Sequence, residues 1–172
     1  MAMMKGICGS GAVQAKIGAA VALLLIVGCA RKEAPVDRKQ IQEFAARYTA
    51  AWCSQDPARV AGFFAEDGSL KINDGKPSVG RVAISAAAQS FMTALPDLVV
   101  AMDGVALDGA HAVYRWTLTG TNTGPGGTGN AVRVSGYEEW TFDGDGLIAQ
   151  SRGHFDAAEY ERQLNAGIGG SG

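Results

Sequence analysis

The chain has 172 residues, 47% of them hydrophobic and 19% charged, with a formal net charge of −2. This composition is typical of a globular protein and excludes a disordered chain. The basic residues are scattered along the sequence, so we expect no nucleic acid partner.

Residues 1–28 have the pattern of a secretory signal peptide. Lys5 and Lys16 are their only charged residues, and the stretch 17–27 is uncharged and apolar. This stretch is too short for a membrane-spanning helix, which needs roughly 20 residues, but it suits a signal peptide. The residues that end it, Ile-Val-Gly followed by Cys29, resemble the lipobox of bacterial lipoproteins.

The resemblance to a lipoprotein implies cleavage before Cys29 and attachment of lipid to that residue. Residues 29–36 would then form a short lipidated tether to a membrane of the bacterial cell envelope. Ala30 after the cysteine is similar to the pattern of outer-membrane lipoproteins that face the periplasm. The alternative is an ordinary secreted protein in which a cysteine falls here by chance. Cys53 would have no disulfide partner, and we expect it to be a small buried residue.

The first predicted helix begins after Asp37. Asp37 and Gln40 have the spacing of a capping box, in which two side chains bond the backbone N–H groups at the helix start. Apolar residues then recur at helical spacing from Ile41 to Trp52. This spacing predicts an amphipathic helix with one buried face.

Two further helices are predicted in the N-terminal half. Asp56 would cap a short helix whose buried face includes Phe64 and which Gly68 ends. A short strand is expected at 69–73. A third helix is predicted over 81–95, because apolar residues keep helical spacing there and a proline follows.

Beyond the third helix the apolar residues alternate with polar ones, which predicts strands. The predicted strands are 98–103, 110–122, 130–142 and 147–155. The segments between them are rich in glycine and aspartate, as in hairpins, so we expect antiparallel neighbours. A last helix is expected at 156–164 and a flexible tail at 167–172. Helices followed by antiparallel strands predict a single α+β domain over 37–166.

Several short motifs occur in order between residues 40 and 166. They are Trp52, Asp56-Pro57, Phe63-Phe64-Ala65-Glu66-Asp67-Gly68, Gly80-Arg81, Leu95-Pro96-Asp97-Leu98, the segment 116–124, the turn 143–146 and Asp156. In this order they resemble the SnoaL-like polyketide cyclase family of the nuclear transport factor 2-like superfamily. The resemblance implies a cone-shaped α+β barrel, in which a strongly curved antiparallel sheet wraps round three N-terminal helices and leaves an apolar pocket. Relatives include cyclases and isomerases, and also proteins that only bind ligands or partners.

The resemblance also implies that Asp156, at the end of the last strand, is the catalytic acid/base. His154 and Arg152 share its side of the strand because side chains alternate, so His154 would assist and Arg152 would hold the ligand. Alternatives stay open for all three. Asp156 with Glu159 has the spacing of a helix cap, a lone strand histidine is commonly structural, and Arg152 suits a cross-strand ion pair.

The predicted lining of the pocket is aromatic. Trp52, Phe91, Trp116 and Trp140 would contact a flat, largely apolar ligand, or would belong to an ordinary core.

Two polar residues complete the predicted substrate-binding set. Glu138 and Glu139 are consecutive on a strand, so at most one faces the pocket, and Glu138 has the parity of Trp140. Asn122 stands where family members often carry the histidine of Gly-Thr-His-Thr-Gly. Asn122 cannot titrate, so any proton-transfer role of that histidine is absent here.

Two functions are consistent with these features. The first is a membrane-anchored domain that binds a small apolar or polycyclic ligand and carries out cyclisation, isomerisation or dehydration by proton transfer. The second is a non-catalytic lipoprotein module that binds a ligand or a protein, including a second copy of itself. We expect no cofactor and no metal: the G-x-G-x-x-G match at 124–129 lies between two predicted strands, and no Cys/His cluster has metal-ligand spacing.

Overall fold

The computed structural model describes residues 37–108 and 111–170. The predicted signal peptide 1–28, the tether 29–36 and lipidation of Cys29 lie outside the described residues. The elements are α1 (Arg38–Cys53), α2 (Pro57–Ala61), β1 (Phe64–Ile72), β2 (Ser78–Val79), α3 (Gly80–Ala94), β3 (Val99–Asp108), β4 (His111–Thr121), β5 (Ala131–Phe142), β6 (Ile148–Phe155) and α4 (Ala157–Ala166). Among the described residues, no helix is both long enough and apolar enough to cross a membrane.

Helix α1 confirms the predicted capping box. The backbone N–H of Asp37 donates to Oε1 of Gln40 at 3.2 Å, which occupies one of the free groups at the helix start. The apolar stripe of α1 buries Ile41, Tyr48 and Trp52 against the sheet, as the spacing predicts.

The region after α1 differs from the prediction. Asp56 caps α2, with Ala58 N donating to its Oδ1 at 3.0 Å, but the helix ends at Ala61. Phe64 begins strand β1 instead, where it pairs with Ile148 of β6. Gly68 does not end a helix but lies within this strand. A Cβ at this position would lie 2.7 Å from the Ile148 carbonyl oxygen, so only glycine fits there. Pairing with a distant strand therefore overrides the local helical pattern.

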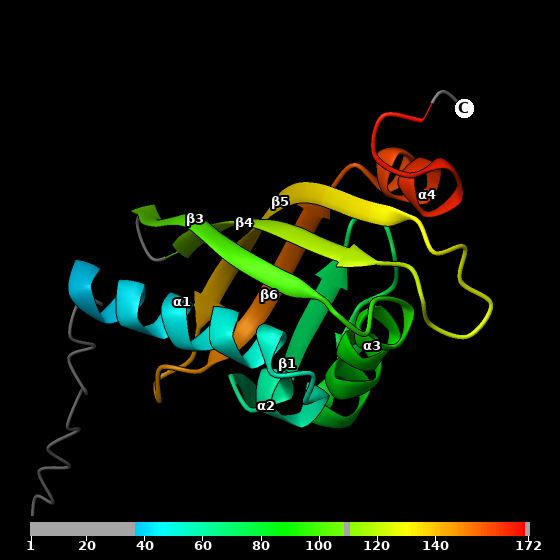
Figure 1. Ribbon diagram of the computed structural model, residues 1–172. Coiled ribbons are helices and arrows are strands. Elements are labelled where there is room, and N and C mark those ends of the chain that lie inside the picture. Colours follow the sequence, from blue (N-terminus) through cyan, green and yellow to red (C-terminus); the bar gives the residue numbers. More distant parts are fainter. Residues whose placement is uncertain (1–36, 109–110, 171–172) are drawn as a thin grey trace, which may run out of the picture. The chain divides into compact units, whose positions relative to one another are not determined.

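The six strands form one mixed sheet in the order β2-β1-β6-β5-β4-β3. Strands β3 to β6 are antiparallel neighbours, which confirms the predicted hairpins. Strand β1 runs parallel to β6, a pairing that the sequence analysis did not predict. The sheet is curved and unclosed, with α1 along β3, α3 along β1 and α4 along β5 (Figure 1). The predicted α+β architecture of cone type is confirmed.

A β-bulge in β6 decides which side chains face inward. Phe142 pairs with Ile148 and Thr141 pairs with Gln150, so Ala149 is an extra residue on β6. Beyond the bulge the odd-numbered residues Ser151 and Gly153 are buried. The even-numbered residues lie on the outer face of the sheet.

Cys53 is exposed, so the prediction of a buried cysteine is wrong. Its thiol lies at the end of α1 beside β3, which is an edge strand of the sheet. Val100 N donates to Cys53 Sγ at 3.2 Å, and the thiol is 3.3 Å from the Val100 carbonyl oxygen. The thiol thus forms hydrogen bonds with the N–H and C=O groups of Val100 on the edge of the sheet, where no further strand pairs with β3.

Candidate ligand pocket

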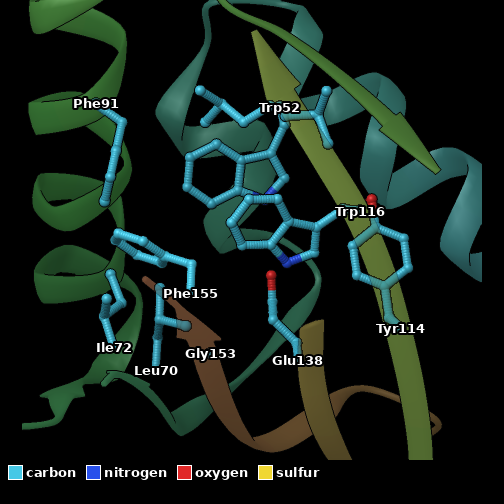
Figure 2. Close-up of a pocket in the computed structure, with 11 residues that line it drawn as sticks. Trp52, Leu70, Ile72, Phe91, Tyr114, Trp116, Glu138, Gly153 and Phe155 are labelled. Atoms are coloured by element: carbon cyan, nitrogen blue, oxygen red, sulfur yellow. The ribbon is translucent and has the colours of Figure 1, made fainter. Parts of the chain in front are cut away.

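An apolar pocket lies between the helices and the inner face of the sheet (Figure 2). Its volume is about 50 Å³. The lining consists of Trp52, Leu70, Ile72, Phe91, Val100, Tyr114, Trp116, Leu118, Glu138, Gly153 and Phe155. Only Ile72, Phe91 and Phe155 of these side chains are half-buried rather than buried, so they mark the mouth of the pocket.

Glu138 is the only carboxyl group among the described residues that line this pocket. It is 6% exposed, whereas Glu139 is exposed on the outer face. The prediction that one of the two faces inward, and that Glu138 shares the side of Trp140, is therefore confirmed. Gly153 is the partner of Glu138 on β6, and a Cβ there would lie 3.7 Å from Glu138 Cγ.

The two oxygens of Glu138 have unequal surroundings. Oε2 accepts hydrogen bonds from Ser151 Oγ at 2.6 Å, Trp140 Nε1 at 2.9 Å and the Tyr48 hydroxyl at 3.1 Å. Oε1 has a single long contact, 3.4 Å from the same Tyr48 hydroxyl. A proton on this carboxyl group would therefore reside on Oε1, because the lone pairs of Oε2 are already used.

Burial raises the pKa of Glu138 above its ordinary value, because the charged form loses its hydration. The hydrogen bonds from Ser151, Trp140 and Tyr48 act in the opposite direction and only partly offset burial. Tyr114, the other ionisable group of the lining, has its pKa raised far above the neutral range, again by burial. Burial thus moves the pKa of Glu138 toward the neutral range and that of Tyr114 further from it, which makes Glu138 the pocket group suited to exchange a proton.

Trp116 contributes a second polar atom to the pocket. The Trp116 side chain extends from β4 over Gly136, its partner on β5, where a Cβ would lie 2.6 Å from the indole ring. The indole Nε1 is buried and has no hydrogen-bond partner. In Figure 2 this nitrogen points toward the carboxyl group of Glu138.

The structure brings together four members of the predicted substrate-binding set, namely Trp52, Phe91, Trp116 and Glu138. The other three do not line the pocket, which corrects the prediction. Trp140 is fully buried and holds Glu138 through its indole N–H. Asn122 lies near the β4–β5 loop, where its amide donates to Thr128 Oγ1 at 3.2 Å. Arg152 is exposed on the outer face of β6.

The predicted catalytic pair, Asp156 and His154, also lies outside the pocket. Asp156 is exposed and caps α4, with Glu159 N donating to its Oδ1 at 2.9 Å, so the alternative role as a helix cap is confirmed. His154 stacks on Tyr137 at 4.8 Å, and its Nε2 is 3.6 Å from Glu139 Oε2. The bulge in β6 explains the position of His154, because it places the even-numbered side chains of the strand on the outer face. Asp156 follows the end of this strand and caps α4 instead.

Sequence reasoning missed the residues that hold the carboxyl group, Tyr48 and Ser151. The alternation of β6 could have indicated Ser151, because Ser151, Gly153 and Phe155 are the small or apolar residues between the polar ones. Tyr48 lies 90 residues before Glu138, so its role depends on packing alone. Within 37–108 and 111–170, no group of three or more His, Cys, Asp or Glu side chains could hold a metal ion.

The chain is similar to a known protein family and to several solved structures. The model of the SnoaL-like polyketide cyclase family matches residues 42–164. A putative SnoaL-like polyketide cyclase from Jannaschia sp. CCS1 is 20% identical, with 78% of this chain and 97% of that chain covered and a TM-score of 0.68. TsrD from Streptomyces laurentii is 25% identical, with coverages of 76% and 98% and a TM-score of 0.65.

A third solved structure contains a bound small molecule. It is a hypothetical protein with a ketosteroid isomerase-like fold from Catenulispora acidiphila, in complex with trimethylamine. It is 18% identical, with 72% of this chain and 92% of that chain covered and a TM-score of 0.64. No curated protein matches this chain at a significant level.

Proposed function

Because this chain belongs to the SnoaL-like polyketide cyclase family, we propose that its pocket binds a small, largely apolar ligand and that Glu138 exchanges a proton with it. Cyclisation, isomerisation and dehydration are reactions that such an exchange serves without a cofactor. The observation that carries the proposal is a buried carboxyl group in an aromatic pocket, with three hydrogen bonds to one oxygen and a single long one to the other.

The arrangement suits Oε1 as the reacting atom. The three hydrogen bonds to Oε2 hold the plane of the carboxyl group and stabilise its anion. Burial raises the pKa, so the same group can take a proton from a C–H bond and return it. The apolar walls strengthen these electrostatic interactions, because little water shields the charges.

The size of the pocket favours a small ligand over a polycyclic one. Its volume of about 50 Å³ is well below the ~150 Å³ of a cavity that holds benzene. A larger ligand would place only one end beside Glu138 and would extend past the half-buried rings of Phe91 and Phe155.

A second candidate function is non-catalytic binding of a small organic cation. Aromatic faces attract such cations, and an ionised Glu138 would have no cationic partner among the described residues. The trimethylamine bound to the structural neighbour from Catenulispora acidiphila supports this candidate.

The experiment that tests proton transfer follows deuterium exchange at the carbon next to the carbonyl of 2-butanone in D₂O. We expect the wild type to accelerate this exchange and Glu138→Gln to lose on the order of 10² or more of the acceleration. Asp156→Asn is the matched control and should keep it. Binding of 2-butanone without acceleration, or binding of trimethylammonium alone, would favour the non-catalytic function.

We also propose that the chain is a lipoprotein of the bacterial cell envelope, anchored through Cys29 on the periplasmic face of the outer membrane. The charge pattern, the apolar run and the cysteine of residues 1–29 support this address. In a Gram-negative host, the wild type should incorporate radiolabelled palmitate and sediment with outer membranes, whereas Cys29→Ser should do neither. An unlabelled wild-type chain would contradict the anchor.

A further inference from the structure

The indole N–H of Trp116 is a donor without an acceptor. The side chain is 9% exposed, and Nε1 has neither solvent nor a protein partner. Buried N–H groups in folded proteins are nearly always hydrogen-bonded, so an unpaired one on a residue that lines a pocket points to an external acceptor.

The direction of this N–H is fixed by packing. Gly136 provides the space in which the indole ring lies, and any side chain at that position would collide with the ring. Phe155 packs edge-to-face against the same ring, with centroids 6.0 Å apart. The ring therefore has little freedom to turn toward a protein acceptor.

The polar group toward which this N–H points is the carboxyl group of Glu138 (Figure 2). The indole nitrogen of Trp116 and the carboxyl group of Glu138 point toward one another (Figure 2), and no hydrogen bond joins them. The lining has two other side chains with a polar atom, Tyr114 and Trp52. The hydroxyl of Tyr114 is hydrogen-bonded to Thr49 at 2.7 Å. The remaining side chains of the lining are apolar. A ligand placed here would meet an unpaired donor, the Trp116 N–H, and a carboxyl oxygen that accepts only one long hydrogen bond.

We infer that Trp116 determines ligand specificity: its indole N–H donates to the oxygen of a small uncharged carbonyl compound, whose adjacent C–H group lies beside Glu138 Oε1. This inference rests on the proposed function of the pocket. A cationic ligand would leave the N–H unpaired, whereas a carbonyl oxygen pairs it. When Oε1 takes the proton, the C–H bond breaks, an O–H bond forms on Glu138, and the electron pair moves to the carbonyl oxygen. The donor bond from Trp116 then strengthens.

The test uses two probes of the same shape, 2-butanone and 2-methylbut-1-ene, of which only the first has an oxygen. Binding to the full chain carrying Cys29→Ser is followed by NMR of the indole N–H signals, assigned with Trp116→Phe and Trp52→Phe. We expect the ketone to shift the Trp116 indole proton downfield and to bind roughly tenfold more tightly than the alkene.

Trp52→Phe is the matched control, because Trp52 also lines the pocket and is also 9% exposed. Trp116→Phe should abolish the preference for the ketone, whereas Trp52→Phe should keep it. If Trp116→Phe does not fold, the wild type alone tests the inference. The ketone should shift an indole proton of the pocket downfield, and the alkene should not.

Equal binding of ketone and alkene by the wild type, or a preference that survives in Trp116→Phe, would overturn the inference and leave the pocket as a ligand site. If neither probe perturbs any residue of the pocket, the proposed function and the inference both fail. Binding of tetramethylammonium in preference to the ketone would also overturn the role of Trp116.

Discussion

Glu138 combines a reactive position with a structural one. Its Oε2 joins Tyr48 of α1, Trp140 of β5 and Ser151 of β6. Removal of the carboxyl group would leave three buried donors without an acceptor, which costs more than the loss of a single hydrogen bond. A glutamine at this position keeps an acceptor oxygen and is the mildest change available.

The raised pKa of Glu138 predicts a specific pH dependence of stability. Folding favours the protonated form, so this group's contribution is fully present below the unfolded pKa of about 4.5 and is lost as pH rises through the folded pKa. The free energy of unfolding of the wild type, minus that of Glu138→Gln, should therefore fall as pH rises above about 4.5. Urea denaturation at a series of pH values measures this difference.

Two other carboxyl groups act in a different pH range. Hydrogen bonds from Thr121 lower the pKa of Asp97, and the bonds from Arg162 and Gln163 lower the pKa of Glu159 to about 2. Their contributions are complete above their unfolded pKa values and are lost only as pH falls. They should be nearly constant above about pH 5.5. A difference between wild type and Glu138→Gln that stays flat or rises there would contradict the assigned direction.

Asp156 should matter for stability and not for ligand chemistry. Asp156→Ala removes the acceptor of the Glu159 N–H and should lower the free energy of unfolding by about 1 kcal/mol. Asp156→Asn should cost less, because asparagine caps helices nearly as well. Denaturation curves and 2-butanone exchange measure the two properties. Loss of exchange at unchanged stability would restore Asp156 as the acid/base.

At the scale of elements, the strand pair β4–β5 holds Trp116 in place through Gly136. A methyl group there would lie 2.4 Å from the His154 carbonyl oxygen and 2.6 Å from the Trp116 ring. Gly136→Ala should therefore lower the free energy of unfolding by about 1–3 kcal/mol, as overpacking does. It should also shift the Trp116 indole signal. Urea denaturation and NMR provide the two measurements.

Gly104→Ala is the matched control for this substitution. Gly104 lies in neighbouring strand β3, and a Cβ there meets nothing within 4 Å. Its stability should change by no more than about 0.5 kcal/mol. Equal losses in the two variants would mean that alanine in place of glycine, rather than the Trp116 contact, causes the effect.

The sequence predicted correctly those elements that are determined by residues close together in the chain. The capping box and apolar stripe of α1 and the hairpins between β3 and β6 are of this kind. The parallel pairing of β1 with β6 and the bulge at Ala149 depend on segments far apart in the chain. Strand alternation therefore grouped Arg152 and His154 correctly but could not assign them to the outer face, and Asp156 lies beyond the strand as the cap of α4.

At the scale of the whole molecule, the outer sheet surface bears on association. Apolar residues exposed on β4 and β5 would favour a dimer through the sheet. Among the described residues of these strands, Tyr137 is the one exposed large hydrophobic side chain, with Arg115 6.0 Å from its ring. Few apolar side chains are therefore exposed on β4 and β5, which argues against a dimer through these two strands.

We therefore expect residues 31–172 to sediment as a monomer, even at high protein concentration. Analytical ultracentrifugation over a range of concentrations makes this measurement. A dimer that Tyr137→Ser dissociates would contradict this expectation and would identify the sheet as an interface.

The aromatic cluster round Glu138 has an optical consequence. Trp140 stacks on Tyr114 with ring centroids 4.7 Å apart and donates its indole N–H to the carboxyl group. The emission of an indole responds to the charge and polarity beside it, and Tyr114 can transfer its excitation to Trp140. Protonation of the carboxyl group and arrival of a molecule beside Trp116 should each change the fluorescence of the unlabelled protein. The chain thus has a reporter of its own, with which compound collections can be screened directly.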